Sequence, residues 1–245
     1  MLRYEGIVPG RFCQRVNRFT AWVELAGGRT LCHVKNTGRC AELLRPGAPV
    51  WCQHSDAPGR KTAYTLITVA RDGAYFNLDS TAPNALAAQW LASGGAGFLP
   101  EQLRREVSWE DSRFDLAFQR AGKPCLLEVK GVTLARDGAG VFPDAPTQRG
   151  TRHVRTLLRA AQAGYGAYVL FVAAMEHVAC VRPNEQNDPA FDRALVEAQQ
   201  AGVTLLALRC KVEPDTITPL TQIQMCIRDS QALRGAAHFL QQLRD

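Results

Sequence analysis

The amino-acid sequence predicts an α/β fold built on a mixed sheet and preceded by a small all-β barrel. Three observations predict it: short strand-like segments fill residues 1–80, strands alternate with helices over residues 100–220, and positive charge is concentrated in the first third of the chain. We therefore expect a barrel over residues 1–80, a helical linker over 81–99, an α/β domain over 100–220 and an atypical tail over 221–245.

The expected barrel strands are short and partly alternate between polar and apolar residues. Residues 18–25 and 30–34 flank Gly27-Gly28, a dipeptide typical of a hairpin turn. Further strands are expected at residues 49–52, 63–69 and 74–78. Five or six short strands in about 80 residues favour a small closed barrel, and the oligonucleotide-binding fold is the commonest basic version of it.

The expected α/β domain follows a helix at residues 82–93, which Gly94-Gly95 ends. Strands are expected at residues 106–109, 113–118, 125–130, 168–172, 177–181 and 203–208, and helices at 151–163 and 189–201. The nearly all-apolar segment 168–172 indicates a central strand covered on both faces. This order of strands and helices predicts a mixed sheet between helical layers.

Charge, cysteines and hydropathy bound the class of protein. Residues 1–80 hold 11 Lys and Arg against 6 Asp and Glu, whereas residues 81–245 hold 18 against 17. A basic module attracts polyanions because neutralising phosphates releases counterions, although a merely basic surface would show the same charge. The eight cysteines show no CxxC pair or zinc spacing, so we expect reduced thiols. With no segment of membrane-helix or signal-peptide length, we expect a cytoplasmic protein without membrane contact.

Asp115, Glu128 and Lys130 form the candidate catalytic group. Glu128 and Lys130 are two apart on an expected strand and therefore share a face, and Asp115 lies on the preceding strand. Two neighbouring carboxylates are tolerated when a divalent cation joins them, and oxygen ligands without His or Cys favour Mg²⁺ or Mn²⁺ over zinc. The lysine could stabilise charge developing on a phosphate. The alternative is an exposed strand with alternating charges, which would show the same Glu-x-Lys pattern.

Several ordered motifs resemble the sugar fermentation stimulation protein A (SfsA) family. They are Glu106, Ser112-Arg113-Phe114-Asp115, Leu127-Glu128-Val129-Lys130-Gly131-Val132-Thr133-Leu134, Phe142-Pro143-Asp144-Ala145, Thr147-Gln148-Arg149-Gly150 with His153, His33-Val34-Lys35-Asn36-Thr37-Gly38, and Pro46-Gly47. The resemblance spans about residues 1–220. It implies an oligonucleotide-binding barrel joined to a PD-(D/E)xK, restriction-endonuclease-like domain, in a bacterial DNA-binding protein linked to regulation of sugar (maltose) metabolism.

The resemblance also implies roles for the acidic residues. Asp115 and Glu128 would be the metal ligands, Lys130 the catalytic lysine, and Glu106 a further catalytic acid placed ahead of the core strands. A carboxylate at the edge of a strand is also commonly solvated, which is the alternative for Glu106.

Four basic residues are candidates for holding nucleic acid. Lys35 and Arg39 belong to the barrel, and we prefer them to its aromatic residues, which in small barrels usually form the core. Arg113 lies two residues before Asp115 in the chain. Arg149 could clamp a phosphate with bidentate donors, or it could be an ordinary surface arginine.

Asp144 and His153 are additional candidates. Asp144 lies in residues 135–150, which are rich in Gly, Pro and Asp and are expected to form a long irregular loop. Such loops usually have a function, so Asp144 could be a further metal-site acid, or it could simply form a turn after Pro143. His153, in the first turn of the next expected helix, could be a general base, although a structural role is favoured.

Two functions compete on this sequence. One is a metal-dependent nuclease that hydrolyses phosphodiester bonds in DNA or RNA, which the complete Asp-Glu-Lys set favours. The other is a non-catalytic DNA-binding transcriptional regulator that retains the nuclease fold, which the description of the family favours. A small-molecule enzyme is disfavoured because the chain has no Gly-rich nucleotide loop, serine elbow or zinc signature. The sequence does not indicate an oligomeric state.

Overall fold

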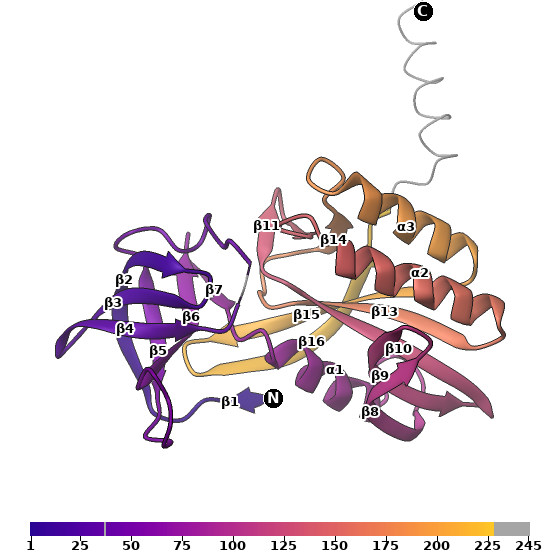
Figure 1. The fold of residues 1–245 in the computed structure, drawn as a ribbon, viewed down its shortest axis with the longest axis horizontal. Helices are drawn as coiled ribbons and strands as arrows, with labels where there is room; N and C mark the ends of the chain where they lie inside the picture. Colours follow the sequence, from indigo (N-terminus) through magenta and orange to yellow (C-terminus); the bar gives the residue numbers. More distant parts are fainter. Residues whose placement is uncertain (37, 228–245) are drawn as a thin grey trace, which may run out of the picture.

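The computed structural model describes residues 1–36 and 38–227. They form two lobes, a β-barrel and a larger sheet with helices on both faces (Figure 1). The two expected architectures, an all-β barrel followed by a mixed α/β sheet, are therefore confirmed. All eight cysteines are free in this structure.

The first lobe is a closed barrel whose strands are β2 (Ile7–Asn17), β3 (Thr20–Leu25), β4 (Gly28–Val34), β5 (Pro49–His54) and β6 (Tyr64–Arg71), with β7 (Ala74–Asn77) paired to β6. Parallel pairing of β4 with β6 closes it. Alternate residues such as Ala21, Val23 and Leu25 fill its interior. Strand β2 was not expected from the sequence, because Pro9 and Gly10 resemble a turn and only Phe12 in this strand is fully buried.

The second lobe is one large sheet with a parallel centre. In addition to β1 (Leu2–Arg3), its strands are β8 (Glu101–Trp109), β9 (Ser112–Arg120), β10 (Lys123–Val132), β11 (Leu134–Arg136), β12 (Ala139–Phe142), β13 (Gly166–Ala173), β14 (Cys180–Pro183), β15 (Thr204–Glu213) and β16 (Thr216–Met225). Their order is β11-β12-β14-β16-β15-β13-β10-β9-β8. Strands β10, β13 and β15 are parallel neighbours, whereas β9 and β8 add antiparallel strands at one edge.

Helices cover both faces of this sheet, as Figure 1 shows. Helices α2 (Gln148–Gln162) and α3 (Pro189–Gln200) pack together on one face, and α1 (Ala82–Ala92) lies on the other. Strand β13 divides its apolar side chains between the two layers: Val169 and Phe171 belong to the cluster that contains α2, and Leu170 and Val172 to the cluster that contains α1. This explains the continuous apolar run in the sequence.

Helix α1 does more than link the two lobes. Its residues Leu86, Ala87, Trp90 and Leu91 are buried in the second core cluster, against strands β9, β10, β13 and β15. The segment expected as a linker is therefore built into the α/β lobe, because nearly every position of this short helix is apolar and needs a covering surface.

The expectation of an irregular stretch at residues 135–150 is wrong. Strands β11 and β12 form a hairpin there, and β12 pairs with β14. Asp137 and Gly138 make its turn with positive φ angles of 53° and 71°, so the Asp-Gly dipeptide was the available signal. Helix α2 also begins at Gln148, before the expected start, because Thr147 caps it.

The end of the second lobe also differs from the expected boundary. Strand β16 continues through Met225 and pairs with β15 and β14, so the sheet includes part of the segment expected to be an atypical tail. The rest of that expected tail, residues 228–245, lies outside the described residues.

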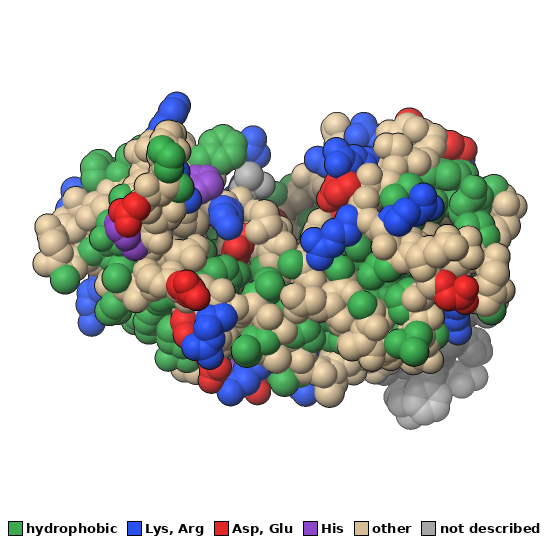
Figure 2. Space-filling view, turned by 90° about the horizontal axis from the view of Figure 1, so that it is seen from below, with side chains coloured by type: hydrophobic (Ala, Val, Ile, Leu, Met, Phe, Trp, Pro, Cys, Tyr) green, Lys and Arg blue, Asp and Glu red, His purple; other side chains and the backbone are tan. Residues whose placement is uncertain are grey.

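The two lobes meet along the end of β7 and the start of the chain. The Asn77 amide donates to the Ala174 carbonyl at 3.1 Å, and strand β1 pairs with β16. Figure 2 shows a hollow between the lobes, with Lys and Arg side chains on both of its sides. Within residues 1–36 and 38–227, no helix is long and apolar enough to cross a membrane.

Candidate functional site

The candidate site forms where strands β9 and β10 separate. Their antiparallel pairing runs from Lys123 and Arg120 to Leu127 and Leu116, and Asp115 and Glu128 follow immediately after it. Beyond this point β10 remains paired only with β13, and the Asp115 carboxylate accepts the Val129 amide at 2.7 Å. A side chain thus replaces the missing strand partner and brings the two acids together.

Asp115 is a partly buried carboxylate with two donors. Its Oδ1 accepts the Asn84 side-chain amide from α1 at 2.6 Å, and its Oδ2 accepts the Val129 amide. Burial, followed by the negative charge of Glu128, raises the pKa of Asp115 to about 6. Nothing in the sequence pointed to Asn84, apart from its being a polar residue in the first turn of an apolar helix.

Glu128 is buried, with 4% of its surface exposed. Its Oε1 accepts the Lys130 ammonium and contacts the His153 Nδ1, both at 2.5 Å. Its Oε2 is buried and has no hydrogen-bond partner within the described part of the chain. Burial by itself raises the pKa of Glu128, but the hydrogen bond from His153 and the charge and hydrogen bond of Lys130 outweigh it, so the net pKa is lowered.

His153 belongs to the site through its contact with Glu128. It lies buried on α2, and its Nε2 is 3.5 Å from the Arg149 Nε. The sequence favoured a structural role in the first helical turn, whereas the structure places the imidazole against the carboxylate. The packing of α2 on β10 creates this contact, and no local pattern in the chain indicates it.

Glu106 and Arg113 lie at the exposed side of the site. Glu106 falls between Arg105 and Val107, which pair with Leu116 and Phe114, so it stands opposite Asp115 in the register. Its carboxylate forms an ion pair with Arg113 at 2.9 Å, and both side chains are largely exposed. The charge of Glu106 contributes weakly to the raised pKa of Asp115, after the effects of burial, Glu128, Val129 and Lys130.

Asp144 lies against Gly38 of the barrel. Its Oδ2 is buried without a hydrogen-bond partner among the described residues, and it approaches Gly38 so closely that a Cβ at this glycine would collide with it. In the part of the chain that the structure describes, no hydrogen bond or ion pair joins Asp144 to Asp115 or Glu128. Its expected role as a metal-site acid stays a prediction.

The two barrel candidates have different surroundings. The Lys35 ammonium pairs with the buried Asp79 carboxylate at 2.9 Å, so its charge is already engaged at the junction of the lobes. Arg39 is exposed. The loop between these two residues is held by Arg15, whose guanidinium donates to the Asn36 and Gly38 carbonyls at 2.6 and 2.9 Å. Binding of nucleic acid by Lys35 and Arg39 stays a prediction.

The described residues contain no group of three or more His, Cys, Asp or Glu side chains arranged to hold a metal ion. Asp115 and Glu128 are therefore a pair of potential ligands rather than a complete protein cage. Mg²⁺ commonly takes one or two carboxylates and keeps water or phosphate oxygens in its other positions, so a pair is compatible with this ion.

Both lobes match models of known protein families. The SfsA N-terminal OB domain matches residues 13–78, and the sugar fermentation stimulation protein RE domain matches residues 81–216. A sugar fermentation stimulation protein homolog from Desulfitobacterium hafniense (strain Y51) is 44% identical over 216 residues, which cover 88% of this chain and 94% of the relative. The homolog from Ruminiclostridium cellulolyticum is 42% identical over 224 residues, which cover 91% of this chain and 99% of that relative.

A solved structure has the same architecture. It is the structure of Pyrococcus furiosus SfsA in complex with Ca²⁺, and it aligns with a TM-score of 0.84 and 26% sequence identity over 92% of this chain and 98% of that one. The order of the two domains, the identities and this shared architecture agree. The chain belongs to the sugar fermentation stimulation protein family.

Proposed function

We propose that the protein is a Mg²⁺- or Mn²⁺-dependent hydrolase of phosphodiester bonds in DNA or RNA. One observation carries the proposal: Glu128 Oε2 is buried and has no hydrogen-bond partner among the described residues. Beside it lies a second carboxylate, Asp115, whose pKa is raised to about 6. A buried carboxylate oxygen without a donor is costly, and two neighbouring acids repel each other. A divalent cation would satisfy the oxygen and relieve the repulsion.

The residues present fit such an ion. Glu128 and Asp115 would hold it through carboxylate oxygens, which are the ligands that Mg²⁺ and Mn²⁺ prefer. Bound there, the cation would supply Lewis-acid stabilisation of the phosphate and lower the pKa of a water molecule. Pyrococcus furiosus SfsA forms a complex with Ca²⁺, which supports a divalent cation in this family, and we extend it to this chain as part of the proposal.

The side chains around the acids have complementary roles in this proposal. Lys130 has 12% of its side chain exposed and carries positive charge into a site that otherwise repels a phosphate. His153 holds Glu128 Oε1 in place, which leaves Oε2 directed elsewhere. Asn84 and the Val129 amide fix both oxygens of Asp115. This preorganises the acids before any ligand arrives.

A second candidate function is a nucleic-acid-binding regulator without turnover. It is favoured by the engagement of Glu128 Oε1 with both Lys130 and His153, and by the lack of a three-ligand group within the described ranges. The name of the relatives refers to sugar fermentation, so under either function we propose a role of this chain in the control of sugar metabolism in the cytoplasm.

Cleavage of labelled single- and double-stranded DNA and RNA, with Mg²⁺, Mn²⁺ or EDTA, tests the proposal. We expect cation-dependent cleavage that falls by roughly two to four orders of magnitude in Asp115→Asn and Glu128→Gln. Glu197→Gln, which neutralises a carboxylate on α3 away from the two acids, is the matched control and should cleave as the wild type does. Equal cleavage by all four proteins would overturn the proposal. Binding without cleavage under every condition would select the regulator.

A further inference from the structure

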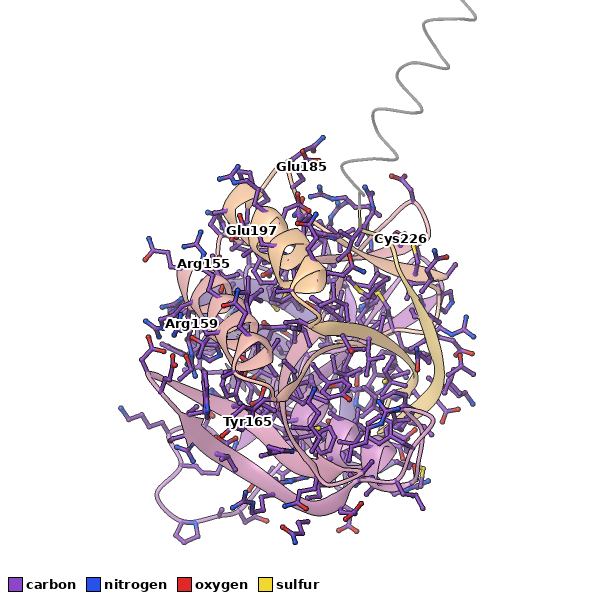
Figure 3. All side chains as sticks on the ribbon, turned by 90° about the vertical axis from the view of Figure 1, so that its right-hand side faces the viewer. Arg155, Arg159, Tyr165, Glu185, Glu197 and Cys226 are labelled. Atoms are coloured by element: carbon purple, nitrogen blue, oxygen red, sulfur yellow. The ribbon has the colours of Figure 1, made fainter. Side chains whose placement is uncertain are left out.

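Helix α2 carries an unusual concentration of charge. Its 15 residues include four arginines, Arg149, Arg152, Arg155 and Arg159, and no acidic residue. All four arginines are exposed, and we call them the arginine row. Figure 3 shows Arg155 and Arg159 along the outer side of α2, next to α3. Like charges three or four residues apart destabilise a helix, and a bound anion would relieve this repulsion.

A groove of about 350 Å³ lies beside the arginine row. It is lined by Arg152, Arg155 and Arg159 together with Thr147 and Asp188, the residues that cap the N-termini of α2 and α3. Helix N-termini carry partial positive charge, so both helices add to the potential of the arginines.

The acidic charge near this groove is largely engaged. Asp188 is buried, and its two oxygens accept the Thr147 and Phe191 amides at 2.7 and 3.0 Å. Glu110 and Asp111 pair with Arg159, at 2.7 and 3.2 Å. Arg152 and Arg155 have no ion-pair partner among residues 1–36 and 38–227. These two guanidinium groups are therefore available to an anion from outside the chain.

The arginine row leads to the candidate site. Arg149 contacts His153 at 3.5 Å, and His153 contacts Glu128 at 2.5 Å. Arg149 and Arg159 are ten residues apart, so the row extends about 15 Å along the helix axis. A nucleic-acid strand that follows the row toward Arg149 therefore approaches the side of the site where His153 contacts Glu128.

We infer that the arginine row and its groove bind the phosphodiester backbone of the nucleic acid whose reactive phosphate enters the Asp115–Glu128 site. This inference rests on the proposed function and assigns the backbone contacts to α2 as a whole. Of the four candidates from the sequence, only Arg149 belongs to this helix. Guanidinium groups suit the purpose because they donate in pairs to phosphate oxygens and stay charged. Contacts of this kind set affinity and register and carry no base specificity.

The test compares two double variants of the full chain in EDTA, where binding is measured without cleavage. Arg152→Gln/Arg155→Gln removes two charges from the row, and Arg104→Gln/Arg105→Gln removes two exposed charges from β8 of the same lobe. The probes are labelled single-stranded DNA, duplex DNA and RNA of one sequence, and vesicles containing phosphatidylserine. Titration across salt concentrations gives the affinity and its salt dependence.

We expect the α2 variant to bind at least about tenfold more weakly, and its salt slope to fall by about 2, because about one counterion is released per phosphate contact. The β8 variant should remain near wild type. Equal affinities and slopes for both variants would overturn the inference, as would a wild type that binds only vesicles or no probe.

The two proposals fail separately. If the nucleic acid binds through the arginine row but is not cleaved with any cation, the proposed hydrolase activity is wrong and the binding role of the row stands. If Arg152→Gln/Arg155→Gln cleaves nucleic acid in a metal-dependent way with an unchanged KM, the binding role of the row is wrong and the proposed hydrolase activity stands.

Discussion

At the scale of single residues, Asp115 connects the chemistry of the site to the stability of the protein. Its carboxylate closes the gap between β9 and β10 by accepting the Val129 amide, and Asn84 fixes its other oxygen. The same position next to Glu128, away from water, raises its pKa to about 6. The residue therefore holds a proton more tightly in the folded chain than in the unfolded chain.

We predict that Asp115 makes the metal-free protein less stable as the pH rises. The stabilisation from its protonated form is full below the ordinary aspartate pKa of 3.8 and is lost as the pH passes through about 6, because the folded state binds the proton more tightly. The difference amounts to on the order of 3 kcal/mol. Urea unfolding at several pH values in EDTA should show this fall in the wild type and a flatter profile in Asp115→Asn. Parallel profiles would contradict the raised pKa.

Sequence reasoning could reach part of this site. The spacing of Glu128 and Lys130 placed both on one face of a strand, and the structure has them hydrogen-bonded. The contacts of Asn84 and His153 depend on how α1 and α2 dock on the sheet, so no local pattern reports them. Lys35 is a case in which the sequence suggested a contact outside the chain and the structure shows one within it. A basic residue in a basic module is expected to bind phosphate, but the Lys35 ammonium pairs with Asp79.

At the scale of elements, local patterns predicted strands with a clear apolar or alternating pattern and missed strands that are mostly exposed or interrupted by proline. Strand β13 was expected because it is apolar on both faces, and the two core clusters account for that. Strand β16 was not expected, since Pro219 interrupts it and only its first two residues, Thr216 and Ile217, are fully buried. Its place in the sheet comes from pairing with β15 and β14, which a local window of sequence does not specify.

Thr147 caps the N-terminus of α2, the helix that carries His153 of the site. The Thr147 hydroxyl accepts the Gly150 amide at 3.0 Å and so satisfies one of the free donors at the helix N-terminus. We predict that Thr147→Ala lowers the free energy of unfolding by about 1 kcal/mol, whereas Thr147→Ser, which keeps the hydroxyl, stays close to wild type. Chemical denaturation of the three proteins measures this. An equal loss in both variants would show that the methyl group, rather than the cap, matters.

At the scale of the whole molecule, the barrel and the sheet are joined by contacts from several parts of the chain. Strand β1 pairs with β16, the end of β7 bonds to Ala174, and the barrel loop that follows Lys35 meets Asp144 at Gly38. The last contact leaves no room for a side chain at Gly38. It places a buried carboxylate oxygen of the α/β lobe, unpartnered among the described residues, against a backbone position where any side chain would collide.

We predict that Gly38→Ala destabilises the protein by about 1–3 kcal/mol, because its Cβ would overlap Asp144 Oδ2 and come within 2.9 Å of Asn36 Oδ1. Gly27→Ala is the matched control, since a Cβ there meets nothing within 4 Å, and it should change stability by no more than about 0.5 kcal/mol. Urea unfolding of both variants provides the comparison. If the loss comes from the contact between the lobes, Gly38→Ala/Asp144→Ala should cost less than the sum of its single variants, because the second change removes the obstructing carboxylate. Additive losses would instead place the strain within the barrel loop itself.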